Sequence, residues 1–218
     1  MIKARILTEG DMMSLNMYRN KLLNAVLFFC QKTLFCNKTK LLKLLYYLDF
    51  IHFKETGYPS IGLTYYTYDK GPVPVRFWKE IQHGVVPSDF KGRFEIECKE
   101  DAKEYIFKAL TNPDLSYFTP REQDILDMLV TKYYDKTAMQ ISEETHLPRQ
   151  PWHTTKITKG MNRQIDYLLC IDEDSGISWD EAKDNLSEFY GVVKNFKLVA
   201  TKSVEQTDAT GRPNNKLA

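Results

Sequence analysis

Apolar residues recur at helical spacings of three and four through LNMYRNKLLNAVLFFCQKTLF, residues 15–35, and predict a helix there. A second helix is predicted from about residue 38 to residue 56. It should end at Gly57, because glycine best tolerates the left-handed conformation that closes a helix. This second helix is apolar on nearly all sides, with Leu45 in its middle. A helix of that kind is usually wrapped by its neighbours, so we expect it at the centre of the fold.

Alternation of period two follows Pro59 and predicts strands. The segment LTYYTYD, residues 63–69, is rich in threonine and tyrosine and places Tyr66 and Tyr68 on one face. The next residues, Gly71-Pro72-Val73-Pro74, predict a rigid turn before another helical pattern. Two further alternating segments, RFEIECK and EYIFKAL, predict a pair of antiparallel strands joined by the polar turn KEDAK.

The clearest helix start in the chain is Thr119-Pro120-Arg121-Glu122. Threonine can cap the helix, proline suits its first position, and the glutamate can reach back to the cap, so a helix is predicted over residues 120–134. The same capping pattern precedes two shorter predicted helices, over AMQISEET and over WDEAKDNLSEFY, at Thr137 with Gln140 and at Ser178 with Glu181. We expect the last of these helices to stop near Gly191.

These elements predict a mainly helical α+β fold, in which a compact helical bundle surrounds the buried central helix and carries a small antiparallel sheet. Residues 1–14 are expected to be an N-terminal extension and residues 15–196 a single domain. The ending TKSVEQTDATGRPNNKLA has no apolar period, so residues 197–218 are expected to form a flexible tail.

Composition narrows the functional classes only a little. The 218 residues are 43% apolar and 27% charged with a formal charge of +1, which excludes a disordered chain and a general nucleic-acid binder. The chain shows neither a signal-peptide core nor an apolar run long enough to span a bilayer, so we expect a cytoplasmic protein. Cys30 and Cys36 lie close in sequence, but their spacing is not that of a zinc or redox site, and free thiols are the favoured interpretation.

Asp49 and His52 form the one candidate catalytic pair, because they lie one helical turn apart in an apolar helix. They could act as a general base with its orienting carboxylate. The favoured interpretation is a buried polar pair that hydrogen-bonds the adjacent strand or turn, since no motif couples them to a nucleophile. Phosphate-binding loops and nucleophile elbows are also missing from the sequence, so we expect neither an enzyme nor a cofactor.

Two candidate metal sites are weak. His146 and His153 flank LPRQPW without a cysteine or carboxylate at ligand spacing, so capping or loop packing is favoured for them. The segment DEDSG, residues 172–176, is similar to a calcium loop, but its glycine comes one place early and Lys183 occupies the twelfth position. We interpret it as a turn and expect no metal.

Charge is segregated along the second half of the chain. Residues 147–165 carry basic side chains and no acids, and Trp152 lies among them. Such a run could touch phosphates and stack a base. Residues 172–188 carry seven acids against Lys183 alone. Two solvated faces of opposite sign are the favoured interpretation, and such faces can steer a protein partner.

Two stretches, KLLNAVLFFC and NKTKLLKLLYYLDFIHFKETGYPSIGLTYYTYDKGPVP, resemble the Panacea domain. This family of antitoxins and phage-associated, SocA-like proteins is marked by a helix of the form L-x-K-L-L-Y-x-x-D/Q, a glycine, a short extended segment and a G-P-V-P turn. The matching residues are Leu41, Lys43, Leu44, Leu45, Tyr46, Asp49, His52, Gly57, Tyr65, Gly71, Pro72, Val73 and Pro74. A weaker similarity continues through TPREQDILDMLVTKYYDKTAMQISEETH, so that the resemblance covers roughly residues 21–186.

The resemblance implies a compact, mainly helical domain with a small sheet that neutralises a toxin encoded by the adjacent gene, mostly by direct binding. It also implies that some relatives deliver a toxin to a protease as adaptors, and it names no catalytic residues. We expect the motif residues to build the rigid half of a recognition module. The expected partner-binding residues, large or charged side chains on the strand and beyond the turn, are Tyr66, Tyr68, Lys70, Arg76 and Trp78. A place in the core remains an alternative for the tyrosines.

A DNA-binding regulator is the second functional hypothesis. The predicted helices 120–134 and 138–145 precede the basic run, and many antitoxins repress their own promoters. The segment HLPRQPWHTT weighs against this hypothesis, because its prolines make an uninterrupted recognition helix unfavourable. A proteolytic adaptor is a further alternative.

Overall fold

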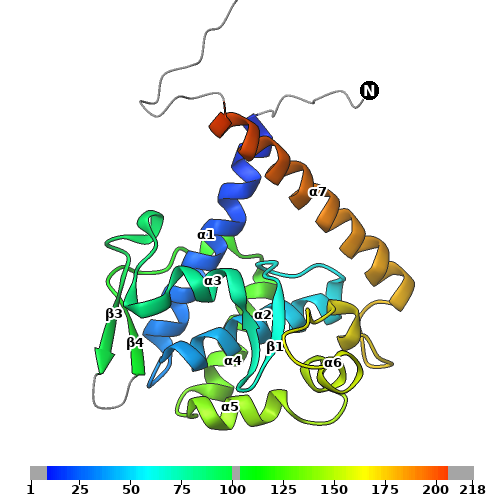
Figure 1. Cartoon of the computed structure of the whole chain (residues 1–218), viewed down its shortest axis with the longest axis horizontal. Helices are drawn as coiled ribbons and strands as arrows, with labels where there is room; N and C mark the ends of the chain where they lie inside the picture. Colours follow the sequence, from blue (N-terminus) through cyan, green and yellow to red (C-terminus); the bar gives the residue numbers. More distant parts are fainter. Residues whose placement is uncertain (1–8, 100–103, 206–218) are drawn as a thin grey trace, which may run out of the picture.

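The computed structural model describes residues 9–99 and 104–205 of the chain, and most of these residues are helical. The helices are α1 (Glu9–Lys32), α2 (Lys38–Thr56), α3 (Val75–Glu80), α4 (Pro120–Tyr133), α5 (Ala138–Thr145), α6 (Pro151–Lys159) and α7 (Trp179–Glu205). The strands are β1 (Tyr65–Tyr68), β2 (Gly71–Pro74), β3 (Phe94–Lys99) and β4 (Glu104–Ala109). Figure 1 shows this arrangement, which confirms the predicted mainly helical α+β fold.

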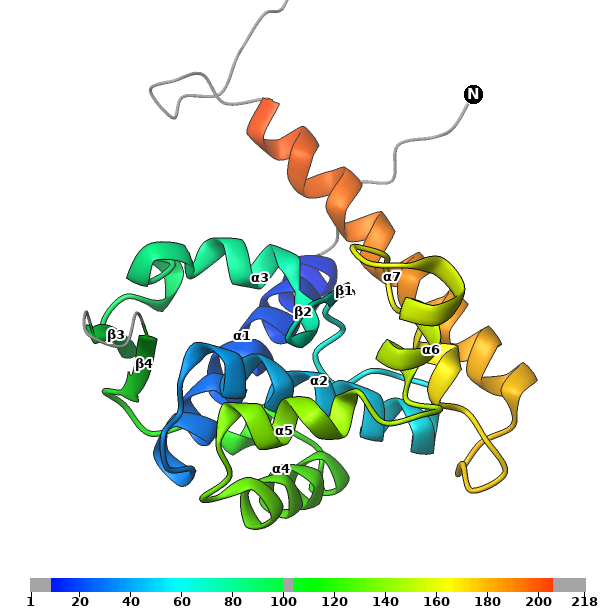
Figure 2. The same cartoon turned by 60° about the horizontal axis from the view of Figure 1, so that its bottom comes forward.

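Helix α2 is the centre of the fold. It contacts α1, α4, α5, α7 and both β-hairpins, and α4 and α5 lie together on one side of it (Figure 2). Leu45 is fully buried, like its neighbours Leu41, Leu44 and Leu48. The burial of each such leucine stabilises the fold by roughly 1.5–3 kcal/mol. Asn37 caps the start of α2, and Gly57 closes its end with a φ of 75°, as its sequence predicted.

Strand β1 is the middle strand of a small three-stranded arrangement. On one side it pairs antiparallel with β2, from Tyr65 opposite Pro74 to Tyr68 opposite Gly71. On the other side the segment 162–165 pairs with it, through a bridge to Gln164 and a hydrogen bond of 2.9 Å from the N–H of Ile165 to the Tyr65 carbonyl. No pattern near β1 predicts this third segment, because its residues lie about a hundred positions further along the chain.

The Gly-Pro-Val-Pro stretch was predicted to be a turn, and this prediction is wrong. Gly71, Pro72, Val73 and Pro74 form strand β2, and the turn of the hairpin is the dipeptide before them. Proline cannot donate a hydrogen bond to a neighbouring strand, so it is accepted in a strand only at an edge or a bulge. Strand β2 meets this condition because it lies at the edge of the arrangement.

The second hairpin confirms the prediction made from RFEIECK and EYIFKAL. Strands β3 and β4 pair antiparallel from Phe94 opposite Ala109 to Lys99 opposite Glu104. They form a separate two-stranded sheet that packs against α1 (Figure 1). Phe94 and Phe107 of this hairpin are buried in the main core.

The capping signals were confirmed at the helix starts. Complete capping boxes join Thr119 with Glu122 and Thr137 with Gln140. Ser178 and Glu181 exchange the same bonds before α7.

Two helices differ from the sequence prediction. Helix α7 does not stop near Gly191 but continues to Glu205, because a single exposed glycine costs a helix only about 1 kcal/mol. Residues 197–205 of the expected tail are therefore helical, and residues 206–218 lie outside the described residues. Helix α6 was not predicted: the prolines of HLPRQPWHTT were expected to prevent one uninterrupted helix there, and residues 146–150 do lie outside a helix, but α6 begins at Pro151. Proline at the first helical position is favourable, and this signal was overlooked.

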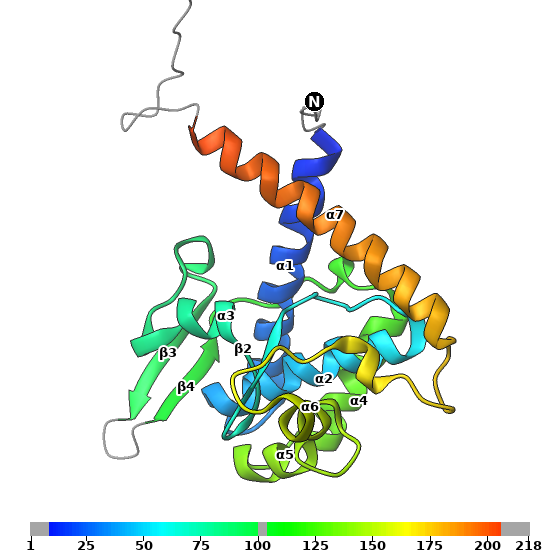
Figure 3. The same ribbon diagram turned by 45° about the vertical axis from the view of Figure 1, so that its right-hand side comes forward.

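Helix α7 crosses α1 on its way out from the body of the molecule (Figure 3). The crossing is held by an edge-to-face contact between Tyr18 and Phe189, with ring centroids 5.5 Å apart. Phe189 also lies against Gly62, whose φ is 79° and where an added Cβ would lie 2.2 Å from the ring. Across the described ranges, we find no helix that combines the length and the apolar character needed to cross a membrane.

Candidate functional site

Asp49, on α2, is the polar centre of the region marked by the sequence motif. Its carboxylate is fully buried and accepts backbone hydrogen bonds from Ile61, Gly62 and Leu63 at 2.6–3.1 Å. The hydroxyls of Tyr65 and Tyr167 donate to it at 2.9 and 3.1 Å. Burial raises the pKa of Asp49, and the backbone donors oppose that rise. The carboxylate therefore fixes the connection between α2 and β1.

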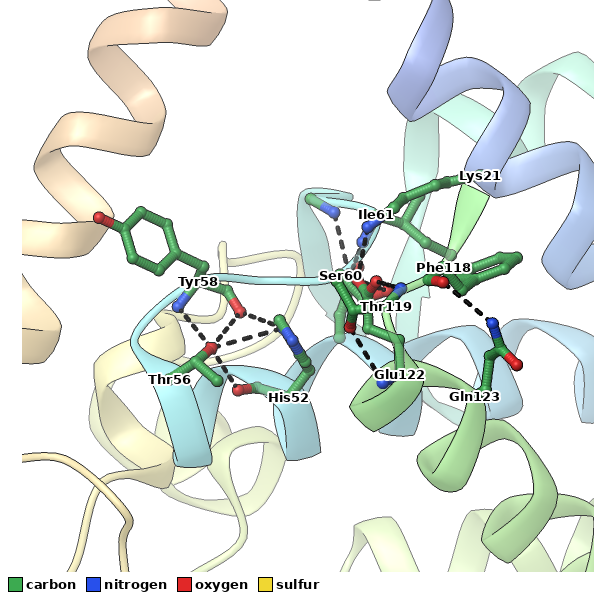
Figure 4. Close-up of polar contacts among 12 residues, drawn as sticks. Lys21, His52, Thr56, Tyr58, Ser60, Ile61, Phe118, Thr119, Glu122 and Gln123 are labelled. Carbon is green, nitrogen blue, oxygen red and sulfur yellow. Dashed lines mark hydrogen bonds and ion pairs between the residues drawn. The ribbon is translucent and has the colours of Figure 1, made fainter. Parts of the chain in front are cut away.

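His52 is engaged separately from Asp49. Its Nδ1 lies 2.7 Å from the carbonyl oxygen of Tyr58, and the Thr56 hydroxyl donates to the carbonyl of His52 at 2.8 Å (Figure 4). Each member of the candidate catalytic pair is thus bonded to the chain that follows α2. Asp49 is buried, as the favoured interpretation expects, whereas His52 is half-buried, and both bond to the turn.

Lys43, on the same helix, is a buried lysine that meets the hairpin. Its Nζ donates to the carbonyl of Pro72 at 2.8 Å, and only 1% of the residue is exposed. Burial lowers the pKa of Lys43 to about 7. Gly71 is required here, because its φ is 97° and an added Cβ would lie 2.6 Å from the Thr145 hydroxyl and 2.8 Å from the Lys43 side chain.

A second buried polar cluster joins α1, α4 and the connection after α2 (Figure 4). Glu122 accepts from Lys21 at 2.5 Å, from the Ser60 hydroxyl at 2.7 Å and from the Thr119 backbone N–H at 2.8 Å. Burial alone would raise the pKa of Glu122, but the hydrogen bond and charge of Lys21 hold it below its ordinary value. Glu122 therefore caps α4 and anchors two distant segments at the same time.

The remaining motif residues lie mostly inside the fold. Leu45, Tyr46, Gly71 and Pro72 are buried, and Val73 is half-buried. Gly57 packs against α7, where an added Cβ would lie 2.8 Å from the Asn185 side chain.

The five expected partner-binding residues lie along the first hairpin and the start of α3. Lys70 and Arg76 are exposed, whereas Tyr66, Tyr68 and Trp78 are half-buried. The rings of Tyr68 and Trp78 pack together with centroids 6.2 Å apart. Lys70 lies in the hairpin turn and Arg76 at the opposite end of β2. Of the five residues, the structure therefore brings together Tyr68 and Trp78.

Two of the residues considered for metal binding, His146 and Asp172, make packing and turn contacts. His146 stacks on Trp152 at 3.9 Å, and the Trp152 indole donates to the Tyr68 carbonyl at 3.1 Å. The carboxylate of Asp172 accepts the N–H of Asp174 and the hydroxyl of Ser175, as in a turn. Among the residues that the structure describes, no group of three or more His, Cys, Asp or Glu side chains is placed to hold a metal ion.

The segregated charges follow two elements. Lys156 and Lys159 are exposed on α6, and Lys156 lies over the Trp152 ring at 4.9 Å. The acidic residues lie in the turn at Asp172 and along the first half of α7, where Glu188 accepts from the Tyr58 hydroxyl at 2.7 Å. Cys30 and Cys36 are free thiols with sulfur atoms 3.6 Å apart.

Sequence reasoning missed the cluster of Glu122 and Lys21. These residues are about a hundred positions apart, and a capping glutamate gives no sign of a second role. Lys43 carried a usable signal, because a lysine among leucines on an apolar helix must find a buried acceptor.

Comparison with known proteins places this region in a family. The family model described as "Antitoxin SocA-like, Panacea domain" matches residues 41–153, just over half of the chain. The match runs from the first turn of α2 to the first turn of α6 and includes Asp49, Lys43, the first hairpin and Glu122. Searches of curated proteins and of solved structures gave no significant match.

Proposed function

Because the chain belongs to the family of SocA-like antitoxins with a Panacea domain, we propose that it neutralises a protein toxin by binding that toxin directly. The toxin would be the product of the adjacent gene, and the complex would form in the cytoplasm without a cofactor. We expect no catalytic step.

The observation that best supports binding over catalysis is the environment of Asp49. Its carboxylate accepts hydrogen bonds from five donors, and the Lys43 amino group donates to the Pro72 carbonyl. The bonded side chains of Asp49 and Lys43 therefore stiffen the protein, while the buried Tyr46 hydroxyl of the same motif has no hydrogen-bond partner. A rigid surface suits binding, because it loses little conformational entropy when a partner docks.

The proposed contact surface is the outer side of the first hairpin and the start of α3. Arg76 and Lys70 offer exposed charge there, and Tyr66, Tyr68 and Trp78 offer aromatic area that is half-buried already. Tyrosine, tryptophan and arginine dominate binding hot spots.

Co-expression with the product of the adjacent gene tests this function. Cells that express that product alone should stop growing, and cells that also express this chain should grow. The two purified proteins should form a complex in calorimetry without any added small molecule. Rescue of growth without a detectable complex, together with a chemically altered toxin, would instead indicate an enzyme.

A DNA-binding regulator remains a second candidate because of α6. Helices α5 and α6 are joined by a short connection, and α6 exposes Lys156, Ile157 and Lys159. Pro148 lies before α6 and Pro151 occupies its first position, so neither proline interrupts this helix. We expect only weak, salt-sensitive DNA binding by the chain alone, and nanomolar binding to its own promoter at physiological salt would favour the regulator.

A further inference from the structure

The connection between α1 and α2 presents an aromatic side chain to solvent. Phe35 is 67% exposed and has a φ of 53°. A bulky residue with positive φ is rare, because its side chain crowds the backbone, and such strain costs of the order of a few RT. Neither the exposure nor the conformation is explained by packing within the described chain.

The connection is fastened on both sides of Phe35. Lys40 is fully buried, and its Nζ donates to the carbonyls of Leu34 at 2.7 Å and Tyr134 at 3.1 Å. The N–H of Leu34 also donates to the Tyr134 carbonyl at 2.9 Å, and the N–H of Phe107 donates to the Cys36 carbonyl at 2.9 Å. The backbone that carries Phe35 is therefore tied to the end of α4 and to β4.

The surroundings of Phe35 are apolar with a positively charged rim. Leu34 and Tyr134 are 42% and 49% exposed, and we call these three residues the Phe35 patch. The charged side chains that flank the patch in sequence are Lys32, Lys38, Asp135 and Lys136, and Glu104 of β4 accepts a hydrogen bond from Asn37 beside them, which leaves a net charge of +1. Burying Lys40 and straining Phe35 both cost stability, so the arrangement is expected to have a use outside the fold.

We propose that the Phe35 patch is an anchor for the toxin, with the Phe35 ring entering an apolar recess whose rim on the toxin is acidic. This inference rests on the proposed function and adds a contact that the hairpin residues do not supply. Aromatic anchors that are held rigidly and surrounded by polar residues carry much of the affinity of protein interfaces. The positive rim would guide an acidic partner.

The charges favour the toxin over the other possible occupants. A second copy of this chain would bring an equally positive rim against the first. Residues 1–8 carry Lys3 and Arg5 and no acid, and residues 206–218 carry Arg212 and Lys216 against Asp208. Both segments would be repelled by the rim of the patch.

The Phe35 patch also borders the surface proposed above. A cavity of about 710 Å³ is lined by Asn37 and Lys38, next to the patch, and by Lys70 in the hairpin turn. Asp69, Glu104 and Glu143 line it too and outnumber its two lysines, so the positive charge beside the patch lies at Lys32 and Lys136, which do not line the cavity. One toxin could therefore touch Lys70 and Phe35 together.

The variant Phe35→Asn tests the anchor. Asparagine tolerates positive φ, so the variant should fold and melt at the same temperature as the unaltered chain or higher. Its dissociation constant for the purified product of the adjacent toxin gene should rise by at least about thirty-fold. The matched control is Ile157→Asn, a change at a residue that is 70% exposed on α6, and it should alter affinity less than about twofold.

The outcomes separate the two proposals. If the unaltered chain does not bind the toxin, the proposed function and this inference both fail. If it binds and Phe35→Asn binds within about threefold of it, the inference alone fails.

The double variant Lys32→Glu, Lys136→Glu tests the charge of the rim. It should slow association with the toxin at low salt, and an unchanged association rate would overturn the acidic rim on the toxin. A dimer of the unaltered chain that Phe35→Asn dissociates would also overturn the inference, because the patch would then be a self-contact.

Discussion

Asp49 has the sequence pattern of a catalytic residue, but its observed hydrogen bonds hold the backbone and two tyrosines in place. The sequence shows an acid one turn from a histidine, and that pattern fits both a general base and a structural pair. The two readings differ in what surrounds the carboxylate, which depends on Ile61, Gly62 and Leu63 and on the distant Tyr167. Local spacing contains no information about a donor more than a hundred residues away.

Replacement of Asp49 by asparagine should destabilise the protein by about 2–4 kcal/mol, because an amide NH₂ would face donors that now share a carboxylate oxygen. Urea unfolding of the purified variant measures this loss. The same substitution at the exposed Asp172 is the control and should cost less than about 1 kcal/mol. An Asp49→Asn variant as stable as the unaltered chain would show that the bonds to the carboxylate contribute little.

Lys43 should make stability depend on pH. Its pKa is about 7 in the fold and about 10.4 in an unfolded chain, so the unfolded state binds more protons between these values. Stability from the neutral amine is therefore complete above about pH 10 and is lost as pH falls towards 7, with a slope of at most about 1.4 kcal/mol per pH unit.

The variant Lys43→Met should lack this dependence. Denaturant unfolding at several pH values between 7 and 9.5 would show the difference as a flatter profile for the variant than for the unaltered chain. The exposed Lys159→Met variant should follow the unaltered chain. Parallel profiles for Lys43→Met and the unaltered chain would mean that Lys43 keeps an ordinary pKa in the fold.

At the scale of elements, the predictions that succeeded depend on short-range rules. Capping boxes at Thr119 and Thr137 each specify a helix start, and Gly57 specifies the end of the leucine-rich α2. The failures arise where one local signal has two meanings. Proline indicates both a turn and an edge strand, as in β2, and both a helix breaker and a helix start, as at Pro151.

Attachment of α7 should depend on a residue outside it. In Gly62→Ala the new methyl group would meet the Phe189 ring and would add strain of about 1–3 kcal/mol at a φ of 79°. Hydrogen exchange of residues 179–192 should accelerate as α7 loosens. Gly92→Ala is a matched control, because Gly92 has a φ of 74° and no atom lies within 4 Å of the new Cβ. Equal exchange in the two variants would mean that strain, and not the ring contact, governs α7.

For the whole molecule, the family can be predicted from the sequence because its motif is local. The contact surface cannot be predicted in this way, because it depends on residues distant in the chain. Tyr66 and Tyr68 alternate as predicted, yet both are half-buried. Their exposure is decided by Trp78 and by the segment 162–165, which no pattern near residue 66 reveals.

Neutralisation of the toxin should therefore depend on the hairpin surface more than on the chain's end. The triple variant Tyr66→Ala, Arg76→Ala, Trp78→Ala should lose most of the growth rescue in co-expression, because it removes aromatic area and an exposed cation. A chain that ends at Glu205 should keep it. Circular dichroism must show both proteins folded. Rescue that survives the triple change and is lost on truncation would move the toxin contact to the C-terminus.

The pairing of the segment 162–165 with β1 means that the region recognised as the family domain does not close upon itself. Strand β2 is blunted as an edge by two prolines, but β1 would present open N–H and C=O groups if the chain ended at residue 153. Unpaired strand edges recruit other strands and promote aggregation. Residues 162–165, beyond the family match, thus protect the edge of β1 from pairing with other chains. The folded unit therefore extends past residue 165.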